Sequence, residues 1–488
     1  MKHPCQKTDT QANDYIMGVP SDHKKISYIQ MKKVHFIAIG GAAMHNLAIA
    51  LSKKEGYEIT GSDDEIFDPS RTRLLECGLL PEKSGWFPEK ITPNLDAVIL
   101  GMHARADNPE LLKAQEFGLQ IYSFPEYLYQ QTQDKIRVVI GGSHGKTTIT
   151  AMILCVLKRL HIAADFMVGA QIEGFENMVS LSEEARIAVF EGDEYLTSPV
   201  DLRPKFHLYQ PHVALLSGIA WDHINVFPTF ENYVEQFRIF ASLIQKNGKF
   251  IYYESDENLR EIAANVREDI TEIPYLTPEY TVENGITFIH INGKKIPLKI
   301  FGTHNLQNLM GACMVCKQLG VNEEDFFAAI AEFSGAANRL EKIAENEHSI
   351  AYKDFAHSPS KLKATVSAVK AQYPDRKLVA CMELHTFSSL TGDFLPEYKD
   401  AMRDADTAFV YYNPEVIEHK KLAEITPKQV KKAFGGAVEV FTNSQELQAV
   451  LKKIDFCDKT LLMMSSGNFD GIDVREFAEK CLNGDFCD

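Results

Sequence analysis

The chain has 488 residues, and at about 150 residues per domain this length predicts about three domains rather than one. Its 45% hydrophobic and 24% charged residues are typical of a folded globular protein and exclude extensive disorder. The formal net charge of −16 opposes binding to a nucleic-acid backbone, which requires a basic surface that this sequence lacks. We therefore expect no nucleic-acid partner and regard small molecules as the better candidates.

Neither the apolar runs nor the cysteines indicate a membrane or an oxidising compartment. No run approaches the roughly 20 apolar residues of a membrane-spanning helix, and the start lacks the apolar stretch of a secretory signal. The nine cysteines form no paired CxxC pattern, and Cys313 and Cys316 lie in an apolar stretch that favours helical packing over metal binding. We expect a cytoplasmic protein with no membrane association and no zinc site.

The first convincing element of the chain is an apolar strand that follows a second methionine, Met31. Residues 1–30 are polar and unpatterned, so we expect a disordered leader, or none if translation starts at Met31. The strand VHFIAI (34–39) runs into GGAAM and an amphipathic helix through Leu51, and EITGSD (58–63) follows as a second strand. This is one βαβ unit of ordinary length.

Further strands and helices alternate along the rest of the chain. DAVILG (96–101) extends the first set, and IRVVI (136–140) opens a second set with a helix that ends at Leu160. Two more apolar strands end in polar or acidic residues, IAVFEGDE (187–194) and VALLSGIAWDH (213–223). A third set begins near Ser349, after FGTHNLQN, and its predicted strands are IAYKDF, KLVACM and TLLMMS. This alternation predicts three α/β domains.

The segment GGSHGKTT (141–148) carries the strongest chemical signal. A glycine-rich turn between a strand and a helix lets backbone N–H groups converge on phosphate oxygens. Lys146 can then reach the outer phosphates, and the Thr147 hydroxyl can bind Mg²⁺. The strict pattern has a glycine where this chain has Ile140, but the strand before the turn and the helix after it are the context that the motif requires. The sequence therefore predicts a phosphate-binding loop.

Metal ligands for such a loop are expected at the ends of the neighbouring strands. Glu191 ends an apolar strand and is the best carboxylate candidate. Asp193 and Glu194 follow on the same loop, where we expect a solvated acidic turn. His223 closes the next predicted strand beside an acid, so we interpret it as a metal ligand or a catalytic residue.

Six motifs follow one another along the chain: GGSHGKTT, EGDE, the DH pair, GTHNLQN, the arginine of GAANRLE, and DFAHSP. This is the order seen in the Mur ligases of bacterial cell-wall synthesis, and the chain resembles that family over about residues 31–475. The resemblance implies an α/β protein with the three-domain Mur ligase architecture. Its parts would be a Rossmann-like UDP-sugar-binding domain at 31–133, a central P-loop ATPase domain at 134–338, and a Rossmann-like C-terminal domain at 339–488 that closes on ATP and binds the acceptor.

Two branches of the family share the N-terminal pattern VHFIAIGGAAM…TGSD and the substrate UDP-N-acetylmuramate. One branch adds L-alanine, and the murein peptide ligases add the recycled tripeptide L-alanyl-γ-D-glutamyl-meso-diaminopimelate. EGDEYLTSPVDLRPKFHLYQP is similar to the peptide ligases, in which a tyrosine, here Tyr195, follows the acidic motif and a D-x-R-x-K-F segment comes soon after. MSSGNFDGI (464–472) also looks like their terminal strand motif. The resemblance favours the peptide ligase, with the alanine ligase as the alternative.

The resemblance also implies a role for individual residues. The residues implied to bind ATP are Gly142, Ser143, His144, Gly145, Lys146, Thr147, Thr148, His304, Asn305, Asn308, Arg339 and Asp354. Those implied to bind the UDP-sugar are Gly40, Gly41, Ala42, Ala43, Met44, Ser62 and Asp63. The implied metal ligands, for Mg²⁺, are Thr147, Glu191 and His223, and the implied catalytic residues are Lys146, His223, Arg339 and His357.

The chain departs from the family pattern at several positions. Ala38 and Ala43 replace glycines of the first turn, which narrows the approach to a pyrophosphate. Lys353 stands where an acid often precedes the DFAH aspartate, and Ser358 replaces a histidine. Some Mur ligases carry a carbamylated lysine where this chain has Arg238, so we expect no carbamate. The segment MELHTFS (382–388) is loosely like the one that reads the incoming amine.

The implied reaction is ATP-dependent ligation. The lactyl carboxylate of UDP-N-acetylmuramate would be phosphorylated, and the peptide's amine would then displace phosphate from the acyl phosphate in peptidoglycan recycling. A non-catalytic UDP-muramate-binding protein is a further alternative, which the intact Lys146, Thr147 and Glu191 oppose. A nicotinamide-dependent oxidoreductase lacks support because the third glycine of its fingerprint is missing, and a folate polyglutamating ligase would lack the separate N-terminal domain. The sequence does not indicate an oligomeric state.

Overall fold

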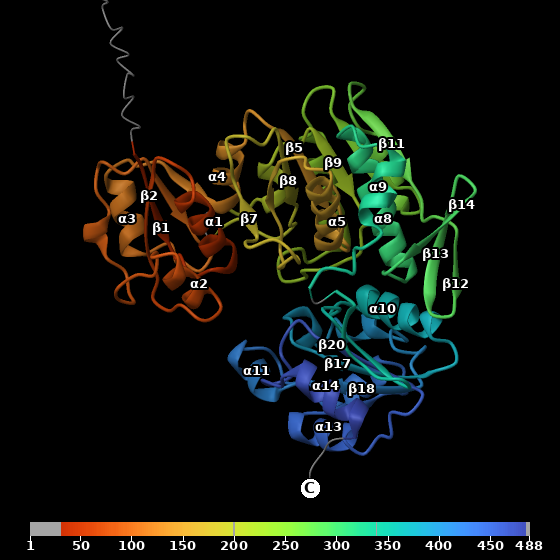
Figure 1. Ribbon diagram of the computed structural model, residues 1–488. Coiled ribbons are helices and arrows are strands. Elements are labelled where there is room, and N and C mark those ends of the chain that lie inside the picture. The colour runs from red at the N-terminus through yellow and green to blue at the C-terminus, as the bar shows by residue number, and fades with distance from the viewer. Residues whose placement is uncertain (1–30, 199–200, 338, 485–488) are drawn as a thin grey trace, which may run out of the picture.

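The chain forms three lobes that follow one another along the sequence (Figure 1). The computed structural model describes residues 31–198, 201–337 and 339–484, and the expected leader at 1–30 lies outside these ranges. Each lobe is built on a sheet of its own, and a small additional sheet borders the second lobe. The predicted three-domain α/β architecture is therefore confirmed.

The N-terminal lobe contains a parallel sheet with the strand order β2-β1-β3-β4. The predicted strands at 34–39, 58–63 and 96–101 are confirmed within two residues. The strands β2 and β3 lie on opposite sides of β1 in this order, so the chain changes direction across the sheet at β1. The carboxyl end of β1 is therefore a topological switch point, where open sheets bind ligands. The elements are β1 (Lys32–Ile37), α1 (Ala42–Ser52), β2 (Tyr57–Ser62), α2 (Ser70–Glu76), η1 (Pro88–Lys90), β3 (Ala97–Leu100), α3 (Pro109–Glu116), β4 (Ile121–Ser123) and α4 (Phe124–Gln131).

The central lobe is built on a seven-stranded sheet with the order β11-β10-β9-β5-β8-β6-β7, parallel except for β7. The expected strand at 213–223 ends at Leu216, because the chain turns at Gly218 (φ 149°) to accept a hydrogen bond from the Ser143 N–H at 2.9 Å. The elements are β5 (Ile136–Gly141), α5 (Lys146–Arg159), β6 (Ala164–Met167), β7 (Val179–Ser180), β8 (Ile187–Glu191), η2 (Lys205–Leu208), β9 (Val213–Leu216), α6 (Phe230–Ser242), β10 (Lys249–Tyr253), α7 (Glu257–Ala263), β11 (Thr271–Tyr275), α8 (Thr303–Gln318) and α9 (Glu323–Ile330).

A three-stranded antiparallel sheet, β12 (Tyr280–Glu283), β13 (Ile286–Ile291) and β14 (Lys294–Leu298), lies at the edge of the central lobe (Figure 1). Its two hairpins turn at Asn284–Gly285 and Asn292–Gly293, and all four residues have positive φ. Asn-Gly is the typical pair for such two-residue turns. This sheet was not predicted, although both pairs are visible in the sequence.

The C-terminal lobe has a six-stranded sheet with the order β15-β16-β20-β17-β18-β19, in which only β15 is antiparallel. The three strands predicted after Ser349 are confirmed as β16, β17 and β20. The elements are β15 (Glu341–Glu345), β16 (Ile350–Asp354), α10 (Pro359–Gln372), β17 (Lys377–Glu383), η3 (Ser388–Leu390), η4 (Leu395–Tyr398), β18 (Thr407–Tyr411), α11 (Pro414–His419), α12 (Pro427–Ala433), β19 (Glu439–Phe441), α13 (Ser444–Leu451), β20 (Lys459–Met464) and α14 (Val474–Asn483).

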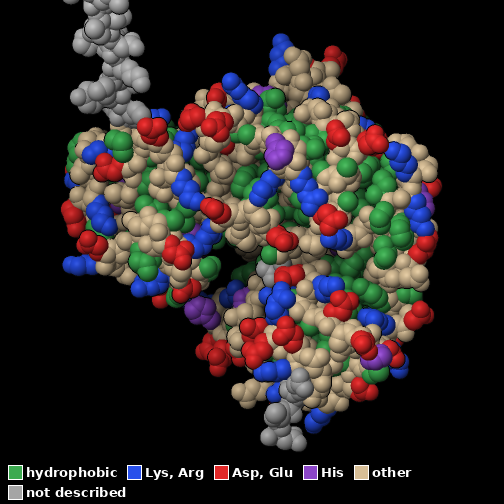
Figure 2. All heavy atoms as spheres, viewed as in Figure 1, with side chains coloured by type: hydrophobic (Ala, Val, Ile, Leu, Met, Phe, Trp, Pro, Cys, Tyr) green, Lys and Arg blue, Asp and Glu red, His purple; other side chains and the backbone are tan. Residues whose placement is uncertain are grey.

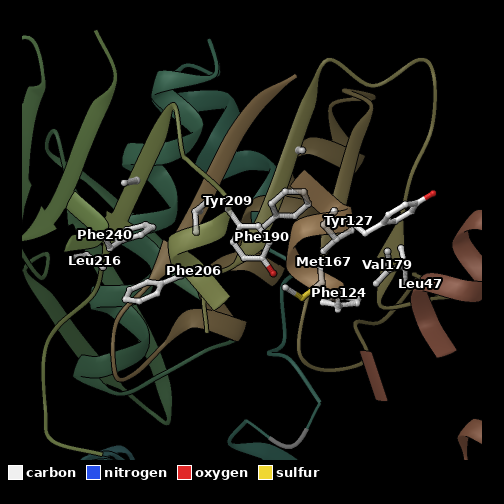
Figure 3. Packing of buried hydrophobic residues seen from close by; sticks show 14 of the residues in the cluster. Leu47, Phe124, Tyr127, Met167, Val179, Phe190, Phe206, Tyr209, Leu216 and Phe240 are labelled. Atoms are coloured by element: carbon white, nitrogen blue, oxygen red, sulfur yellow. The ribbon is translucent and has the colours of Figure 1, made fainter. Parts of the chain in front are cut away.

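One hydrophobic core runs through the N-terminal and central lobes. It includes Leu47 of α1, Val179 of β7, and Met167 and Phe190 of the central sheet (Figure 3). Polar contacts reinforce this junction, since Arg73 donates a hydrogen bond to Asn177 Oδ1 at 2.8 Å. These two lobes are therefore packed as one body at this junction.

Cys313 and Cys316 lie on α8 and are fully buried in a second hydrophobic core, which confirms the predicted helical packing. Burial raises the pKa of both thiols, that of Cys313 to about 12. None of the described helices combines the length and the hydropathy of a membrane-spanning segment.

A buried ion pair next to the strand β5 provides a test of the central core. Lys135 Nζ lies 2.6 Å from Asp165 Oδ2, and the two side chains are 5% and 1% exposed. Lys135→Met leaves Asp165 buried without its counterion, so we expect a loss of about 3–5 kcal/mol in the free energy of unfolding. Urea denaturation followed by circular dichroism measures this loss.

The matched control for this variant is Lys33→Met. Lys33 pairs with Glu58 at 3.4 Å, and the two side chains are 37% and 50% exposed, so the loss of this pair is expected to cost less than about 1 kcal/mol. Equal unfolding midpoints for the two variants would contradict a stabilising role for the buried pair.

Candidate active site

The loop between β5 and α5 has the conformation expected of a phosphate cradle. Gly142 (φ 122°) and Gly145 (φ 75°) adopt backbone conformations that favour glycine, and α5 begins immediately afterwards at Lys146. A Cβ atom at Gly145 would overlap the side chain of Asn308, which packs against the loop from α8. The N-terminus of α5 carries no side-chain cap and is open to an anion.

Lys146 is held in the loop by a buried carboxylate. Its Nζ lies 2.6 Å from Glu194 Oε2 and donates a second hydrogen bond to the Gly142 carbonyl at 2.8 Å. The Glu194 side chain is 1% exposed and also accepts a hydrogen bond from the Tyr233 hydroxyl at 3.0 Å. The expectation of a solvated acidic turn is therefore wrong for Glu194. Asp193 pairs with Lys205 at 2.6 Å.

This network fixes the charge of each member. Burial alone raises the pKa of Glu194, but the nearby Lys146 and His223 outweigh it and hold that pKa well below its usual value. Burial lowers the pKa of Lys146, and Glu194 with Asp193 more than reverses this effect. Glu194 is thus a carboxylate and Lys146 an ammonium ion at neutral pH.

Thr147 and Glu191 offer the donor set of a magnesium site. The Thr147 hydroxyl donates to Glu191 Oε1 at 2.8 Å, and the Gly169 N–H donates to Glu191 Oε2 at 2.6 Å. A hydroxyl and a carboxylate beside a phosphate cradle are the oxygen ligands that Mg²⁺ takes in nucleotide sites. The residues present therefore fit the predicted metal.

His223 lies next to the Glu194 oxygen that Lys146 does not contact. Its Nε2 is 3.6 Å from Glu194 Oε1, and its ring packs edge-on against Tyr195 with centroids 5.0 Å apart. Burial lowers the pKa of His223, but Glu194 and Asp222 raise it above its ordinary value. Its φ of 56° is unusual for histidine, and such strain often accompanies functional sites.

The C-terminal lobe brings His357 to the same site. His357 Nε2 lies 3.9 Å from Asp222 Oδ2, and its Nδ1 is 2.9 Å from the Phe355 carbonyl oxygen. Burial, reinforced by Lys361, lowers the pKa of His357 to about 3, so the ring is neutral. The predicted sites on the two lobes are therefore adjacent.

Arg339 and Asp354 lie at the junction of the central and C-terminal lobes. The Arg339 guanidinium stacks on the Phe355 ring at 4.5 Å. Asp354 is 7% exposed, and its carboxylate accepts hydrogen bonds from the N–H groups of Leu340 and Ala356 at 2.6 and 2.7 Å. Asp354, on the strand β16, thus fixes the backbone next to Arg339 through its hydrogen bond with Leu340.

A cavity of about 560 Å³ adjoins this junction, and Thr148, Asn305 and Arg339 are among the residues that line it. Asn305 is held in place by its hydrogen bond to the Phe301 carbonyl at 2.9 Å. Burial lowers the pKa of the nearby His304. Three of the residues predicted to bind the nucleotide therefore surround one cavity beside the phosphate loop.

The predicted UDP-sugar residues gather at the carboxyl ends of β1 and β2. The Gly40 N–H donates to Asp63 Oδ2 at 2.7 Å, and Lys90 Nζ lies 3.3 Å from the Ser62 hydroxyl. The helix α1 begins at Ala42 without a side-chain cap, and the short side chains of Ala42 and Ala43 are exposed there. Met44 is buried below them. Ala38 adopts a φ of 65°, the conformation that glycine supplies without strain.

The segments MELHTFS and MSSGNFDGI meet at the carboxyl ends of β17 and β20. Glu383 is 3% exposed and accepts hydrogen bonds from the Ser465 hydroxyl and the Phe469 N–H, the latter at 2.8 Å. His385 Nδ1 lies 3.7 Å from Glu383 Oε1, and a Cβ at Gly467 would meet the His385 ring at 2.8 Å. MELHTFS and MSSGNFDGI therefore pack against each other at this edge of the sheet.

Three residues of the site were missed or misread in the sequence. Glu194 is the buried partner of Lys146, and Ser360 and Lys361 reach the central lobe from the first turn of α10. A lysine in the first turn of a helix is unfavourable, because its charge is repelled by the positive end of the helix dipole. This unusual position could have indicated Lys361 in the sequence. Arg238, by contrast, forms ion pairs with Glu231 and Glu261 on the surface.

Comparison with known protein families finds a match for each of the three lobes. Residues 33–135 match the Mur ligase family catalytic domain, 140–316 the Mur ligase middle domain, and 338–467 the Mur ligase glutamate ligase domain. The chain belongs to the Mur ligase family. It is therefore an ATP-dependent amide-bond-forming ligase of peptidoglycan synthesis.

Several relatives extend over most of this Mur ligase. The UDP-N-acetylmuramate–L-alanine ligase of Caldicellulosiruptor bescii is 31% identical over 78% of this chain and 83% of its own. The UDP-N-acetylmuramate–L-alanyl-γ-D-glutamyl-meso-2,6-diaminoheptandioate ligase of Haemophilus influenzae is 27% identical over 91% of this chain and 98% of its own. The crystal structure of the alanine ligase of Thermotoga maritima covers 92% of this chain and 98% of its own, with a TM-score of 0.68 and 20% identity, and so shows the same fold.

The phosphate loop of this Mur ligase offers a sharp test at Gly145. Gly145→Ala introduces both an unfavourable φ and an overlap with Asn308, so we expect nucleotide binding to weaken by at least about 100-fold in calorimetric titrations with ADP. Gly78→Ala is the matched control, because Gly78 has a φ of 69° with open space around it.

The control variant isolates the cost of the backbone conformation, about 1 kcal/mol of stability, and should bind ADP normally. Normal ADP binding by a folded Gly145→Ala variant would contradict the assigned role of the loop.

Proposed function

We propose that this Mur ligase joins the lactyl carboxylate of UDP-N-acetylmuramate to the amine of L-alanyl-γ-D-glutamyl-meso-diaminopimelate, in peptidoglycan recycling. The observation that carries the proposal is the segment EGDEYLTSPVDLRPKF, which resembles the murein peptide ligases. Tyr195 of this segment lies against His223, and its hydroxyl accepts a hydrogen bond from Asn225 Nδ2 at 3.1 Å. The distinguishing tyrosine is therefore part of the candidate active site.

The remaining charged residues of this segment hold it in place. Lys205 pairs with Asp193, and Arg203 pairs with Asp201 at 2.7 Å and with Glu126 of α4 at 3.1 Å. The segment thus links the nucleotide site to the N-terminal lobe.

The cluster of Glu383, His385 and Gly467 is a second proposed contact with the acceptor. It lies at the carboxyl ends of parallel strands, the usual place for ligands in α/β sheets. The Ser466 hydroxyl is buried there without a hydrogen-bond partner among the described residues. Figure 2 shows a hollow between the lobes, with basic, acidic and histidine side chains around its rim.

The first chemical step replaces a poor leaving group with a good one. A carboxylate oxygen of the muramate attacks the γ-phosphorus of ATP, the bond to the β-phosphate oxygen breaks, and ADP leaves. Lys146 and Arg339 offset the charge of the transferring group. Mg²⁺ held by Thr147 and Glu191 would supply further charge stabilisation. A second ion at His223, the other proposed metal site, would require the neutral ring, which Glu194 and Asp222 disfavour.

In the second step the peptide's amine attacks the acyl carbon, the carbon–oxygen bond to phosphate breaks, and the amine gives up a proton. His357 and His223 are the proposed acceptors of that proton. In the neutral His357 ring Nδ1 donates to the Phe355 carbonyl and Nε2 keeps its lone pair, but a pKa of about 3 makes this ring a weak base. Glu194 and Asp222 raise the pKa of His223, so His223 is the stronger base of the two in its neutral form. Closure of the C-terminal lobe excludes water from the acyl phosphate.

Addition of L-alanine in de novo peptidoglycan synthesis is the second candidate function. The curated relatives favour it, since most of them are UDP-N-acetylmuramate–L-alanine ligases. Both reactions share the nucleotide sugar and the phosphorylation step. They differ only in the amine.

A panel of acceptors separates the two functions. Purified protein with ATP, Mg²⁺ and UDP-N-acetylmuramate should release phosphate with the tripeptide at least about tenfold faster, in kcat/KM, than with L-alanine. The amide product is identified by mass spectrometry. A preference for L-alanine would replace the proposed function with the second candidate, and activity with neither amine would contradict both.

A further inference from the structure

The first turn of α10 makes direct contacts with the phosphate loop. Ser360 Oγ lies 2.9 Å from His144 Nε2, and Lys361 Nζ lies 3.5 Å from Asp222 Oδ2. These two contacts join the C-terminal lobe to the central lobe beside Lys146. Lys361 therefore carries its charge across the boundary between the two lobes.

Asp222 is the anion that receives this charge. Its carboxylate is 9% exposed, and its Oδ1 already accepts a hydrogen bond from the His223 N–H at 2.8 Å. Its other oxygen, Oδ2, lies 3.5 Å from Lys361 Nζ and 3.9 Å from His357 Nε2. Asp222 thus offers one carboxylate oxygen to the C-terminal lobe.

The position of Lys361 is nevertheless unfavourable for a cation. It lies in the first turn of α10, where the helix dipole repels positive charge. Burial lowers the pKa of Lys361, and Lys146 and Arg339 lower it further, while Asp222 and Glu194 act in the opposite direction. Three cations, Lys361, Lys146 and Arg339, thus lie near two carboxylates, Asp222 and Glu194.

The N-terminus of α10 also contains a buried hydroxyl that makes no capping hydrogen bond. Its N-cap residue, Ser358, is 4% exposed and makes no capping hydrogen bond, and its hydroxyl has no partner among the described residues. Phosphate oxygens bound beside Lys146 would supply the missing negative charge and hydrogen-bond acceptors.

We propose that Lys361 is a positioning residue that couples closure of the C-terminal lobe to the presence of phosphate on the nucleotide. Pairing with Asp222 holds the lobe against the phosphate loop, and the phosphate charge offsets the repulsion between Lys361 and Lys146. Loss of that charge when products leave restores the repulsion and favours opening. The inference rests on the family's use of ATP and is independent of which amine is the acceptor.

Small-angle X-ray scattering tests this coupling directly. The radius of gyration is followed while the full-length protein is titrated with a non-hydrolysable ATP analogue and Mg²⁺. The wild type should become more compact, and Lys361→Met should need roughly tenfold more analogue for the same change. Lys361→Arg, which keeps the charge, should restore most of the response.

Lys363→Met is the matched control, because Lys363 lies on the same helix with an exposed side chain. It should behave as the wild type. Thermal unfolding of each variant identifies a folding defect, and Lys361→Arg keeps the test decisive if Lys361→Met fails to fold.

Kinetics supply a second readout. With whichever amine is active, Lys361→Met should raise the KM for ATP roughly tenfold, with a smaller effect on the KM for the nucleotide sugar. Compaction of folded Lys361→Met at the wild-type analogue concentration would overturn the proposal, as would failure of Lys361→Arg to restore it. A failed acceptor panel with normal closure would affect only the proposed function.

Discussion

The buried ion pair between Glu194 and Lys146 is the interaction on which the rest of the site depends. A carboxylate that is 1% exposed is stable only if its charges and hydrogen-bond acceptors are satisfied, and Lys146, Tyr233 and His223 together achieve this. The pair fixes the lysine in the phosphate loop, joins the loop after β8 to α6, and orients the histidine that follows β9. Loss of either partner would leave an uncompensated charge in the centre of the active site.

The C-terminal lobe adds a second set of contacts beside this pair. Asp222 receives both Lys361 and His357 from that lobe, and the Phe301 ring packs against Tyr352 and Tyr373 with ring centroids 5.3 and 6.2 Å apart. The boundary between the central and C-terminal lobes is therefore partly charged and partly apolar. The proposed coupling to bound phosphate acts on the charged part, because apolar contacts do not respond to charge. One hydrophobic core also joins the N-terminal lobe to the central lobe.

The sequence predicts the parts of the fold and site that depend on local pattern. The phosphate loop could be predicted because glycine, lysine and threonine lie side by side in the chain, and the strands because their apolar runs are continuous. The role of Glu194 could not, since its burial depends on Tyr233, which is 39 residues away. The role of Lys361 could not be predicted either, because it depends on the contact of α10 with Asp222, which is distant in the sequence. The antiparallel sheet was predictable from its two Asn-Gly pairs, but it interrupts the α/β alternation on which the predicted fold was based.

Isotope transfer tests the central claim most directly, because it reports which atom receives the phosphoryl group. UDP-N-acetylmuramate labelled with ¹⁸O in its lactyl carboxylate is incubated with the enzyme, ATP, Mg²⁺ and the active amine, and the products are analysed by mass spectrometry. Phosphorylation of the carboxylate predicts one ¹⁸O atom in the inorganic phosphate for each amide bond formed. Unlabelled phosphate, or label in AMP, would contradict the account.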